Sequence, residues 1–258
     1  VVDSMMYDGL FCAFDQVAMG AGTEKYAASA GLERGPQDDL AAKSHERAAA
    51  AIKEGRFADE IVNVEVPQRR GDPIVVDTDE GVRPGTTVES LAALRPAFDK
   101  AGNITAGNAS QISDGGAAVV VVSKAVAERL GAQPLGEIVG YGQVAGPDPS
   151  LLTQPSRAIN AALESAGRSI GDVDLFELNE AFAAVGLASM ADLGISDDVV
   201  NVNGGAIALG HPIGMSGTRV ALTLLHELKR RGGGLGAAAL CGGGGQGGPP
   251  GFGAATEE

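Results

Sequence analysis

The chain has 258 residues, a formal net charge of −14 and 44% hydrophobic residues. This length allows one large or two ordinary domains with an ample core, and the near-zero mean hydropathy is typical of globular proteins. The acidic balance argues against nucleic acid as a partner. Apolar runs such as residues 117–122 are far too short for a membrane span, so we expect no membrane partner.

The cysteine content and the first residues indicate the compartment. Two cysteines, Cys12 and Cys241, cannot form a disulfide framework, so we expect a reducing cytoplasm. Val1, Val2 and Asp3 supply no basic region of a secretory signal. The chain opens on Val rather than Met, already inside a strand-like run, which indicates part of a longer protein.

The first 110 residues are expected to be largely helical and then irregular. Residues 36–39 cap a helix through residues 41–53, and residues 61–66 alternate like a strand. Residues 67–109 are rich in Gly, Pro, Asp and Thr with little periodicity. Because irregular segments of that length are uncommon and usually functional, we expect loops that cover a ligand, with a disordered linker as the alternative.

From Gly115 the pattern changes to alternating strands and helices, which indicates an α/β domain. Strands are expected at residues 117–123 (a buried one), 138–141, 173–178, 199–203 and 236–241. Helices are expected at residues 124–130, 155–166, 182–193 and 214–231. Ligands in such domains bind beyond the carboxyl ends of strands, where Asn179, Asn203 and Cys241 fall.

His211 is the leading candidate for proton transfer. It lies in the glycine-rich stretch 204–217, before an expected helix, where backbone N–H groups and a helix N-terminus converge. Histidine has the unperturbed pKa nearest neutrality, which suits acid–base catalysis. A lone histidine is more often structural, and we interpret His45 and His226 as solvated helix residues.

Further polar side chains at strand ends are candidates. Cys241 precedes four glycines, where a thiol can reach a substrate and His211 can act as its base; the alternative is a small buried hydrophobe. Cys12 has the apolar context of a core cysteine. Asn179 can hold a water or donate to an oxyanion, with Glu180 in support, and can also cap the next helix. The glycine N–H groups after Cys241 suit an oxyanion hole, and no metal-ligand spacing occurs.

Several motifs together resemble those of the thiolases. The signatures are Asn-Glu-Ala-Phe at 179–182, the Asn-Val-Asn-Gly-Gly stretch through Gly-His-Pro-Ile-Gly at 201–214, and Cys-Gly-Gly-Gly at 241–244. The resemblance extends to residues 56–61, 94–98 and 105–110, and it covers nearly the whole chain. It implies an α/β fold with a thiolase-like layered αβαβα architecture, incomplete at the N-terminus. The implied domains are a loop domain that covers coenzyme A (1–110), the last part of the N-terminal domain (111–133) and the C-terminal domain (134–258).

The resemblance implies acyl transfer between coenzyme A thioesters, making or cleaving acetoacetyl-CoA or a longer 3-ketoacyl-CoA. In the family a nucleophilic cysteine carries the acyl group; by similarity His211 would activate it and bind one thioester oxygen. Cys241 would move the proton at the α-carbon, and Asn179 would hold the water of the first oxyanion hole. The backbone N–H of Gly243 would join the second oxyanion hole. The implied substrate-binding positions are Met19, Phe98, Ala106, Ser110, Ala181 and Phe182.

The sequence departs from the family pattern in ways that affect these expectations. Nothing in the chain matches the nucleophilic cysteine and its Ser-Gly context, so we expect the chain alone to be inactive in the complete reaction. Ala18 stands where short-chain biosynthetic thiolases often have histidine, and residues 151–155 replace a Gly-rich stretch, which leaves acyl chain length open. Residues 247–251 are not expected to form the apolar final strand of the family, which would then be missing or rebuilt.

The predicted function is therefore a thiolase-type acyltransferase, an acetyl-CoA acetyltransferase or 3-ketoacyl-CoA thiolase, with a coenzyme A thioester as substrate and no cofactor or metal. The alternatives are a non-catalytic thiolase-like protein that binds acyl-CoA or lipid, and a structural partner subunit. The missing nucleophile favours the alternatives, whereas Asn179, His211 and Cys241 favour an enzyme. The resemblance also implies acyl-CoA or acetyl-CoA as the ligand and a homodimer or homotetramer.

Overall fold

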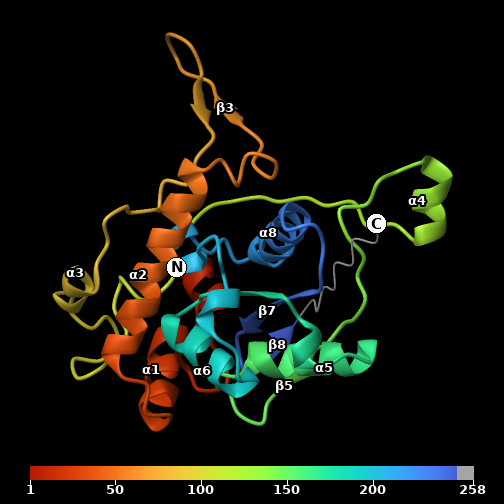
Figure 1. The fold of residues 1–258 in the computed structure, drawn as a ribbon. Coiled ribbons are helices and arrows are strands. Elements are labelled where there is room, and N and C mark those ends of the chain that lie inside the picture. Colours follow the sequence, from red (N-terminus) through yellow and green to blue (C-terminus); the bar gives the residue numbers. More distant parts are fainter. Residues whose placement is uncertain (249–258) are drawn as a thin grey trace.

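A four-stranded mixed sheet lies at the centre of the structure, a computed structural model that describes residues 1–248 (Figure 1). Its strand order is β5-β8-β7-β6, where β6 and β7 are parallel and β8 runs antiparallel to both β7 and β5. The strand bounds are β5 (Val144–Ala145), β6 (Leu175–Leu178), β7 (Gly236–Gly242) and β8 (Gln246–Gly248). The parallel pair ends at the same edge, where Asn179 follows β6 and Cys241 is the penultimate residue of β7.

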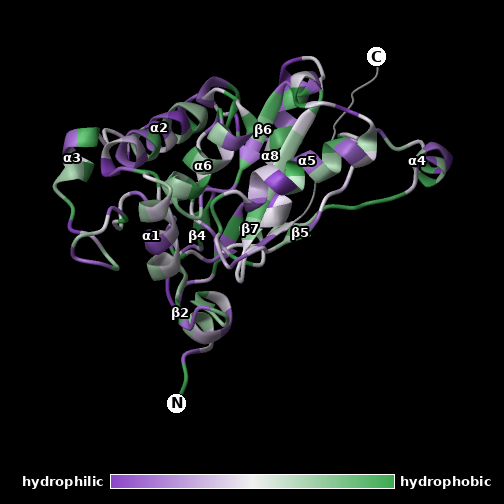
Figure 2. Ribbon diagram, turned by 90° about the horizontal axis from the view of Figure 1, so that it is seen from below, coloured by the Kyte–Doolittle hydropathy of each residue, from purple (hydrophilic) through white to green (hydrophobic). Residues whose placement is uncertain are grey.

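Helices cover both faces of this sheet. Helices α5 (Gln154–Ala166) and α6 (Ala183–Leu193) pack on one face, through a core that includes Phe176 and Leu178. Helix α8 (Ser216–Arg230) packs on the other face, through a core that includes Leu175 and Leu224. Side chains along β6 thus alternate between the two faces. Figure 2 shows α5 with alternating hydrophilic and hydrophobic stripes, as expected for a helix with one buried face.

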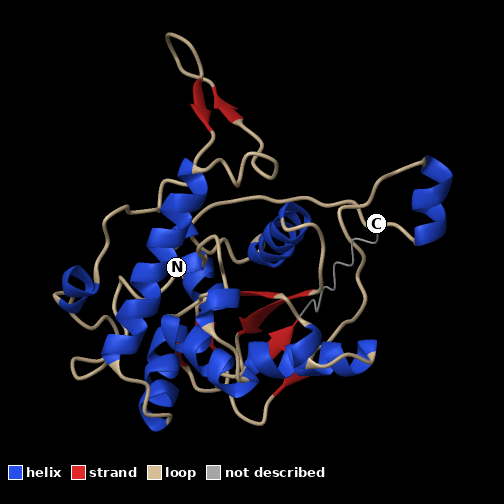
Figure 3. Cartoon of the chain, viewed as in Figure 1, coloured by secondary structure: helices blue, strands red, loops and turns tan. Residues whose placement is uncertain are grey.

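The N-terminal part packs beside this body. Helix α2 (Arg34–Lys53) contacts α6 and the short α7 (Ala206–Leu209), and so lies next to the loop that carries the candidate histidine. The hairpin of β3 (Val64–Val66) and β4 (Ile74–Val76) projects away from the body (Figure 3). The other elements are η1 (Met5–Gly9), β1 (Phe11–Cys12), β2 (Val17–Ala18), α1 (Met19–Ser29), α3 (Val88–Ala92), α4 (Lys124–Leu130), η2 (Ile170–Asp172) and η3 (Asp197–Val199).

The α/β class and most of the expected helices are confirmed. Helix α4 has the expected bounds, and α5, α6 and α8 agree within two residues at each end. Helix α2 begins at Arg34, before the expected cap, and includes Pro36 in its first turn, where the missing N–H costs nothing. The irregular segment 67–109 also contains β4 and α3. The expected architecture has αβαβα layers. Within residues 1–248 the structure contains three of them, the four-stranded sheet and the helix layer on each of its faces.

Three expected strands are wrong. Residues 117–123 and 138–141 form no strand, and Val200 makes only an isolated bridge with Phe176. The side chains of Val119 to Val122 are exposed rather than buried. A strand requires a hydrogen-bonding neighbour, and within the described residues no strand pairs with these segments. Their apolar composition therefore did not suffice to define a strand.

The expectation for the final strand is also corrected. Residues 247 and 248 were not expected to form a strand, but β8 includes both glycines. Gly247 lies against α5, and a Cβ there would lie 2.3 Å from the carbonyl oxygen of Gln154. Glycine is therefore required for β8 to approach this helix. Residues 249–251, which were also expected to interrupt this strand, lie outside the described residues. Among the described helices, none has both the length and the apolar character to cross a membrane.

Candidate active site

Glycines position the loop that carries His211. Gly210 has φ +94°, in the left-handed region, and a Cβ there would lie 2.3 Å from Ser113 Oγ. Gly204 has φ +84° and leaves no room for a Cβ against α2 at Ala48. The backbone N–H of His211 then donates to the carbonyl of Gln111 at 3.2 Å. The chain thus needs glycine on both sides of α7 to bring the histidine to the sheet edge.

The imidazole of His211 is held by hydrogen bonds at both nitrogens. Nδ1 lies 2.6 Å from Ser216 Oγ, and Nε2 lies 3.2 Å from Asn179 Nδ2. Because the amide nitrogen of Asn179 can only donate, Nε2 accepts and Nδ1 carries the proton. Nδ1 then donates to Ser216 Oγ, which in turn donates to the carbonyl of Pro212 at 3.0 Å. The arrangement orients one neutral tautomer of the ring.

The surroundings of His211 also favour the neutral form. Burial and, as the smaller cause, the positive charge of Arg219 together lower its pKa to about 4. At neutral pH the ring is therefore an uncharged base rather than an imidazolium ion. Such a group can accept a proton or bind a polarised oxygen once it is protonated.

Asn179 follows β6 and lies at the parallel strand ends. Its backbone N–H donates to Ala239 of β7 at 2.9 Å, which continues the ladder by one residue. The side chain is fully buried, and its Oδ1 has no hydrogen-bond partner among the described residues. Asn179 does not cap α6, because Phe182 holds the N-cap position without a side-chain bond. The interpretation of Asn179 as a helix cap is therefore wrong, and its amide is directed at His211.

Glu180 serves the site as a structural anchor. Its buried carboxylate accepts hydrogen bonds from Ser44 Oγ at 2.7 Å, Asn201 Nδ2 at 2.9 Å and the Ile207 N–H at 3.1 Å. The first donor belongs to α2 and the third to α7. The second belongs to the segment after η3, which runs beside β6. Burial raises its pKa, although each of these bonds acts in the opposite direction. Glu180 therefore fixes the segments that carry Asn179 and His211.

Cys241 lies on the neighbouring strand end but is not joined to His211. Within the described residues no hydrogen bond links the two side chains, and Cys241 packs against an apolar cluster that includes Leu152. Burial raises the pKa of its thiol to about 12, so the thiol is protonated at neutral pH. Gly243 follows in the exposed turn before β8, and a Cβ there would lie 2.4 Å from Met19 Cε. Cys12 is buried, as expected for a core cysteine.

Four of the six expected substrate-binding residues lie together. The rings of Phe98 and Phe182 meet edge to face, with centroids 6.3 Å apart. The N–H of Ser110 donates to the carbonyl of Ala181 at 3.0 Å. Met19 lies beside Gly243 and, like Phe182, packs against the apolar cluster that includes Leu152. Ala106 is exposed in a turn, and within the described residues no hydrogen bond joins it to the other five.

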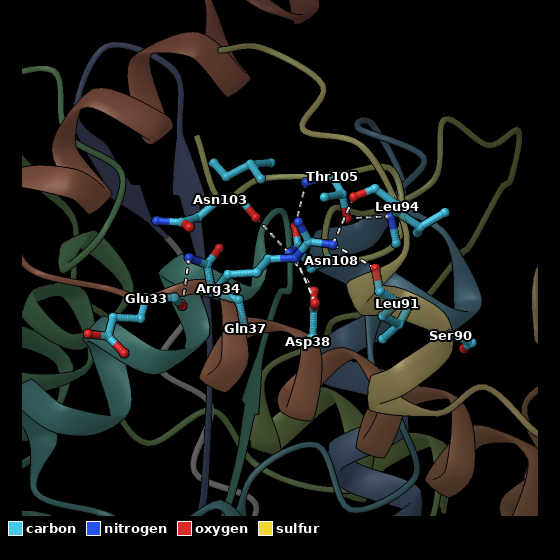
Figure 4. A network of polar contacts seen from close by, with 12 residues as sticks. Glu33, Arg34, Gln37, Asp38, Ser90, Leu91, Leu94, Asn103, Thr105 and Asn108 are labelled. Carbon is cyan, nitrogen blue, oxygen red and sulfur yellow. Dashed lines mark hydrogen bonds and ion pairs between the residues drawn. The ribbon is translucent and has the colours of Figure 1, made fainter. Parts of the chain in front are cut away.

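A buried polar network holds the segment around Phe98 and Ser110 against α2 (Figure 4). Arg34 Nε pairs with Asp38 Oδ2 at 2.6 Å, and Arg34 Nη2 donates to the carbonyl of Leu91 at 2.6 Å. Asn108 Nδ2 donates to the other oxygen of Asp38 at 2.9 Å. Asn108 Oδ1 accepts from the Thr105 N–H at 2.8 Å. One carboxylate thus couples the helix to both ends of this segment.

Sequence reasoning missed three residues around the site and misjudged the other two histidines. Ser216 hydrogen-bonds to His211, and the buried pair of Glu177 and Arg219 lies on the same strand and helix as Asn179 and Ser216. The one available signal was Glu177, a charged residue within the otherwise apolar strand β6. His45 is buried, with 5% exposure, and its Nδ1 accepts from the Arg83 N–H at 3.1 Å. The expectation of a solvated His45 is therefore wrong, and His226 is half-buried. Within residues 1–248 no group of His, Cys, Asp and Glu could hold a metal ion.

The fold is that of a thiolase-type α/β protein, and comparison with known proteins agrees. Residues 1–125 match the family described as "Thiolase, N-terminal domain" and residues 132–249 match "Thiolase, C-terminal domain". The chain therefore belongs to the thiolase family.

Relatives and solved structures support the same assignment. A probable acetyl-CoA acetyltransferase of Mycolicibacterium smegmatis is 57% identical over 91% of the chain and 60% of its own length. An acetyl-CoA acetyltransferase of Pseudomonas aeruginosa is 54% identical over 90% of the chain and 59% of its own length. The crystal structure of the Bacillus anthracis acetyl-CoA acetyltransferase superposes with a TM-score of 0.91 at 42% identity, covering 96% of this chain and 62% of that one. The crystal structure of human mitochondrial 3-ketoacyl-CoA thiolase superposes with a TM-score of 0.87 at 40% identity, covering 95% of this chain and 61% of that one. The chain thus spans about three fifths of the length of these proteins.

Proposed function

We propose that the protein acts as a thiolase-type acyltransferase on acetyl-CoA and on acetoacetyl-CoA or longer 3-ketoacyl-CoA thioesters. The observation that carries this proposal is the Asn179–His211–Ser216 chain of hydrogen bonds, which orients a neutral imidazole at the carboxyl ends of β6 and β7. By resemblance to the thiolases, this is where a thioester oxygen would be bound. The relatives named above are acetyl-CoA acetyltransferases, which supports the substrate class.

The step that we assign to these residues is removal of a proton from the α-carbon of the thioester. The C–H bond breaks, the proton moves to the Sγ of ionised Cys241, and the electron pair moves onto the thioester oxygen. A water held by Asn179 donates a hydrogen bond to that oxygen as negative charge develops, and His211 can donate to it as well once Nε2 is protonated. The buried Oδ1 of Asn179, which has no partner among the described residues, supplies an acceptor for such a water.

The raised pKa of Cys241 defines what this step requires. A thiol with a pKa of about 12 is a weak source of thiolate, so ionisation must be coupled to binding of the substrate or to another base. Once ionised, however, so basic a thiolate accepts the α-proton readily. We propose that Cys241 acts as the base of this step and returns the proton as the acid of the reverse step.

The complete reaction also requires an acyl-carrying nucleophile. The sequence contains two cysteines; Cys241 has the acid–base role, and Cys12 is buried with 4% exposure. We therefore propose that these 258 residues do not complete acyl transfer alone, and that α-proton exchange is the partial reaction to examine. We further propose a cytoplasmic homodimer or homotetramer, with residues 1–110, 111–133 and 134–258 as the loop, N-terminal and C-terminal domain parts.

The test is exchange of the acetyl protons of acetyl-CoA with solvent D2O, followed by mass spectrometry of the recovered thioester. We expect exchange by the full chain, and a loss of about 100-fold in each of the His211→Ala, Cys241→Ala and Asn179→Ala variants. His226→Ala, in a half-buried helix position, is the matched control and should exchange at the wild-type rate. Undiminished exchange in His211→Ala would contradict the assigned role. Binding of acetyl-CoA without any exchange would favour the non-catalytic acyl-CoA-binding alternative.

A further inference from the structure

The side chain of Gln111 makes contacts that the proposed reaction does not use. Its Nε2 lies 3.0 Å from the Ile207 carbonyl, 3.1 Å from the Ala208 carbonyl and 3.0 Å from the Gly81 carbonyl. Carbonyl oxygens only accept hydrogen bonds, so the atom that faces all three is the amide nitrogen, and one of its two hydrogens is shared. Gln111 is half-buried in the segment between α3 and α4. The contacts therefore join that segment to α7.

Two of the three acceptors are carbonyls that α7 leaves without a backbone donor. In a continuing helix, the N–H groups of residues 211 and 212 would donate to the carbonyls of residues 207 and 208. Pro212 has no N–H, and the His211 N–H donates to the Gln111 carbonyl instead. Within the described residues no backbone N–H donates to the Ile207 or Ala208 carbonyl. The Gln111 side chain thus takes the place of the two missing donors.

The main chain of Gln111 supplies the acceptor on the other side of the turn at Gly210. Gly210 has φ +94°, and beyond it the His211 N–H donates to the Gln111 carbonyl at 3.2 Å. Ser113 Oγ donates to the same carbonyl at 3.2 Å. One residue therefore holds the chain before Gly210 through its side chain and after Gly210 through its main chain. The imidazole of His211 follows directly from this turn.

The third acceptor, the Gly81 carbonyl, belongs to a segment that is itself anchored on α2. The Arg83 N–H donates to His45 Nδ1 on that helix at 3.1 Å. A Cβ at Gly81 would lie 2.7 Å from Gln111 Nε2 and 2.9 Å from the Ala208 carbonyl oxygen, so glycine is required for this approach. The Gln111 amide is therefore held between α7 and a segment that α2 fixes.

We propose that Gln111 is a positioning residue for His211, which fixes the turn at Gly210 and so sets where the imidazole lies. Its amide caps α7, and its carbonyl binds the His211 N–H. Loss of the amide leaves two helix carbonyls without donors and allows the turn to move. Gln111 acts through the backbone of His211 and not on the substrate. The catalytic consequence rests on the proposed function, whereas the hold on the backbone does not.

The first test is amide hydrogen exchange, measured by NMR in the full chain. The His211 N–H is compared with the N–H of Leu224, a core residue in the middle of α8. In Gln111→Leu the His211 N–H should exchange about tenfold faster relative to that of Leu224, because the turn opens without unfolding of the protein. A residue that only stabilises the whole fold would accelerate both amides equally.

Gln37→Leu is the matched control, because it removes a glutamine with the same kind of contact away from the site. Gln37 Nε2 donates to two carbonyls just before α2, at 3.2 and 3.3 Å. This variant should leave the ratio of the two exchange rates at its wild-type value. Gln111→Asn covers the case in which Gln111→Leu fails to fold. It keeps the amide but is shorter by one methylene, so it withdraws the donors from α7 and should raise the same ratio.

A wild-type ratio in the folded Gln111 variants would overturn the inference, as would an equal rise in Gln37→Leu. The second test is the rate of α-proton exchange in acetyl-CoA. Gln111→Leu should lower kcat about tenfold and leave KM within about twofold, because a displaced His211 affects the reacting oxygen and not the binding of coenzyme A. A raised KM at unchanged kcat would contradict a positioning role. Absence of exchange in the wild type would contradict the proposed function, while the amide exchange ratio would still test the hold on His211.

Discussion

Ser216 Oγ lies 2.6 Å from Nδ1 of His211, so the first residue of α8 holds the ring that the preceding loop carries. The same hydroxyl donates to the Pro212 carbonyl, so Ser216 is hydrogen-bonded to two residues of the loop. The loop alone therefore does not orient the imidazole. The helix start does, and the other side of the ring is held by Asn179.

Replacing Ser216 by Ala should loosen this orientation. The buried Nδ1–H loses its acceptor, so we expect α-proton exchange to fall about tenfold, equivalent to about 1.4 kcal/mol. We expect the free energy of unfolding to fall by about 1 kcal/mol. Exchange into acetyl-CoA and urea denaturation measure the two effects. Thr218→Ala, in the same turn but without a side-chain hydrogen bond among the described residues, is the control; a tenfold loss there would count against a specific role for Ser216.

Glu177→Gln should change how stability depends on pH. Burial raises the pKa of this carboxyl from 4.5 to about 8, so between these values the folded protein keeps a proton that the unfolded chain has lost. This effect makes the wild type less stable as pH rises through that window, by on the order of 1 kcal/mol per pH unit. The Gln variant lacks it, so the difference between variant and wild type should move in favour of the variant from pH 5 to pH 8.

Urea denaturation at several pH values measures this difference, and only its slope with pH is interpreted. The substitution also changes the group that lies 3.5 Å from Arg219 Nη1, and the cost of that change is taken as common to all pH values. Glu128→Gln, at an exposed position of α4, should follow the wild type throughout. A difference between Glu177→Gln and wild type that does not vary with pH would show that Glu177 is ionised in the folded protein.

Local patterns predicted those parts of the fold that depend on local physics. A helix was expected at residues 155–166, and α5 begins one residue earlier; its buried face and the glycine that follows it are both local features. The exposed valines at 119–122 have an equally clear pattern, but a strand depends on a neighbour that the pattern does not identify. His45 reads as part of a polar helix, yet it is buried by the segment around Arg83, which is distant in the sequence.

The same distinction applies to the candidate site. Asn179 and His211 stood out because of their motifs, and the structure joins them by a hydrogen bond. Ser216 and Arg219 look like ordinary residues of an amphipathic helix, and only the packing of α8 on β6 reveals their contacts. Cys241 stood out through its place beside glycines, and the structure leaves it half-buried with one side packed against an apolar cluster.

The polar network in Figure 4 should contribute strongly to stability through Asp38. This carboxylate is 1% exposed and accepts from both Arg34 and Asn108, so Asp38→Asn leaves Arg34 without its counter-charge and places an amide N–H against a donor. We expect a loss of about 2–4 kcal/mol in the free energy of unfolding, measured in urea. The neighbouring Asp39, whose side chain is 53% exposed and pairs with Lys43, is the matched control. Asp39→Asn should cost less than about 1 kcal/mol, and equal losses in the two variants would contradict a special role for the network.

Gly205 and Gly217 flank the candidate histidine and should respond in opposite ways to a single methyl group. At Gly205 the backbone is extended, but a Cβ would lie 2.2 Å from Cδ of Glu180, the carboxyl that fixes α2, Asn201 and α7. Gly205→Ala must displace that carboxylate from its buried donors, so we expect a loss of about 2–3 kcal/mol and weakened α-proton exchange. Gly217 lies within α8, and a Cβ there has no heavy atom within 4 Å, so Gly217→Ala should stabilise the helix by about 0.5–1 kcal/mol. Urea denaturation of both variants decides between this account and one in which glycine serves only to keep the loop flexible, because flexibility alone would make both substitutions stabilising.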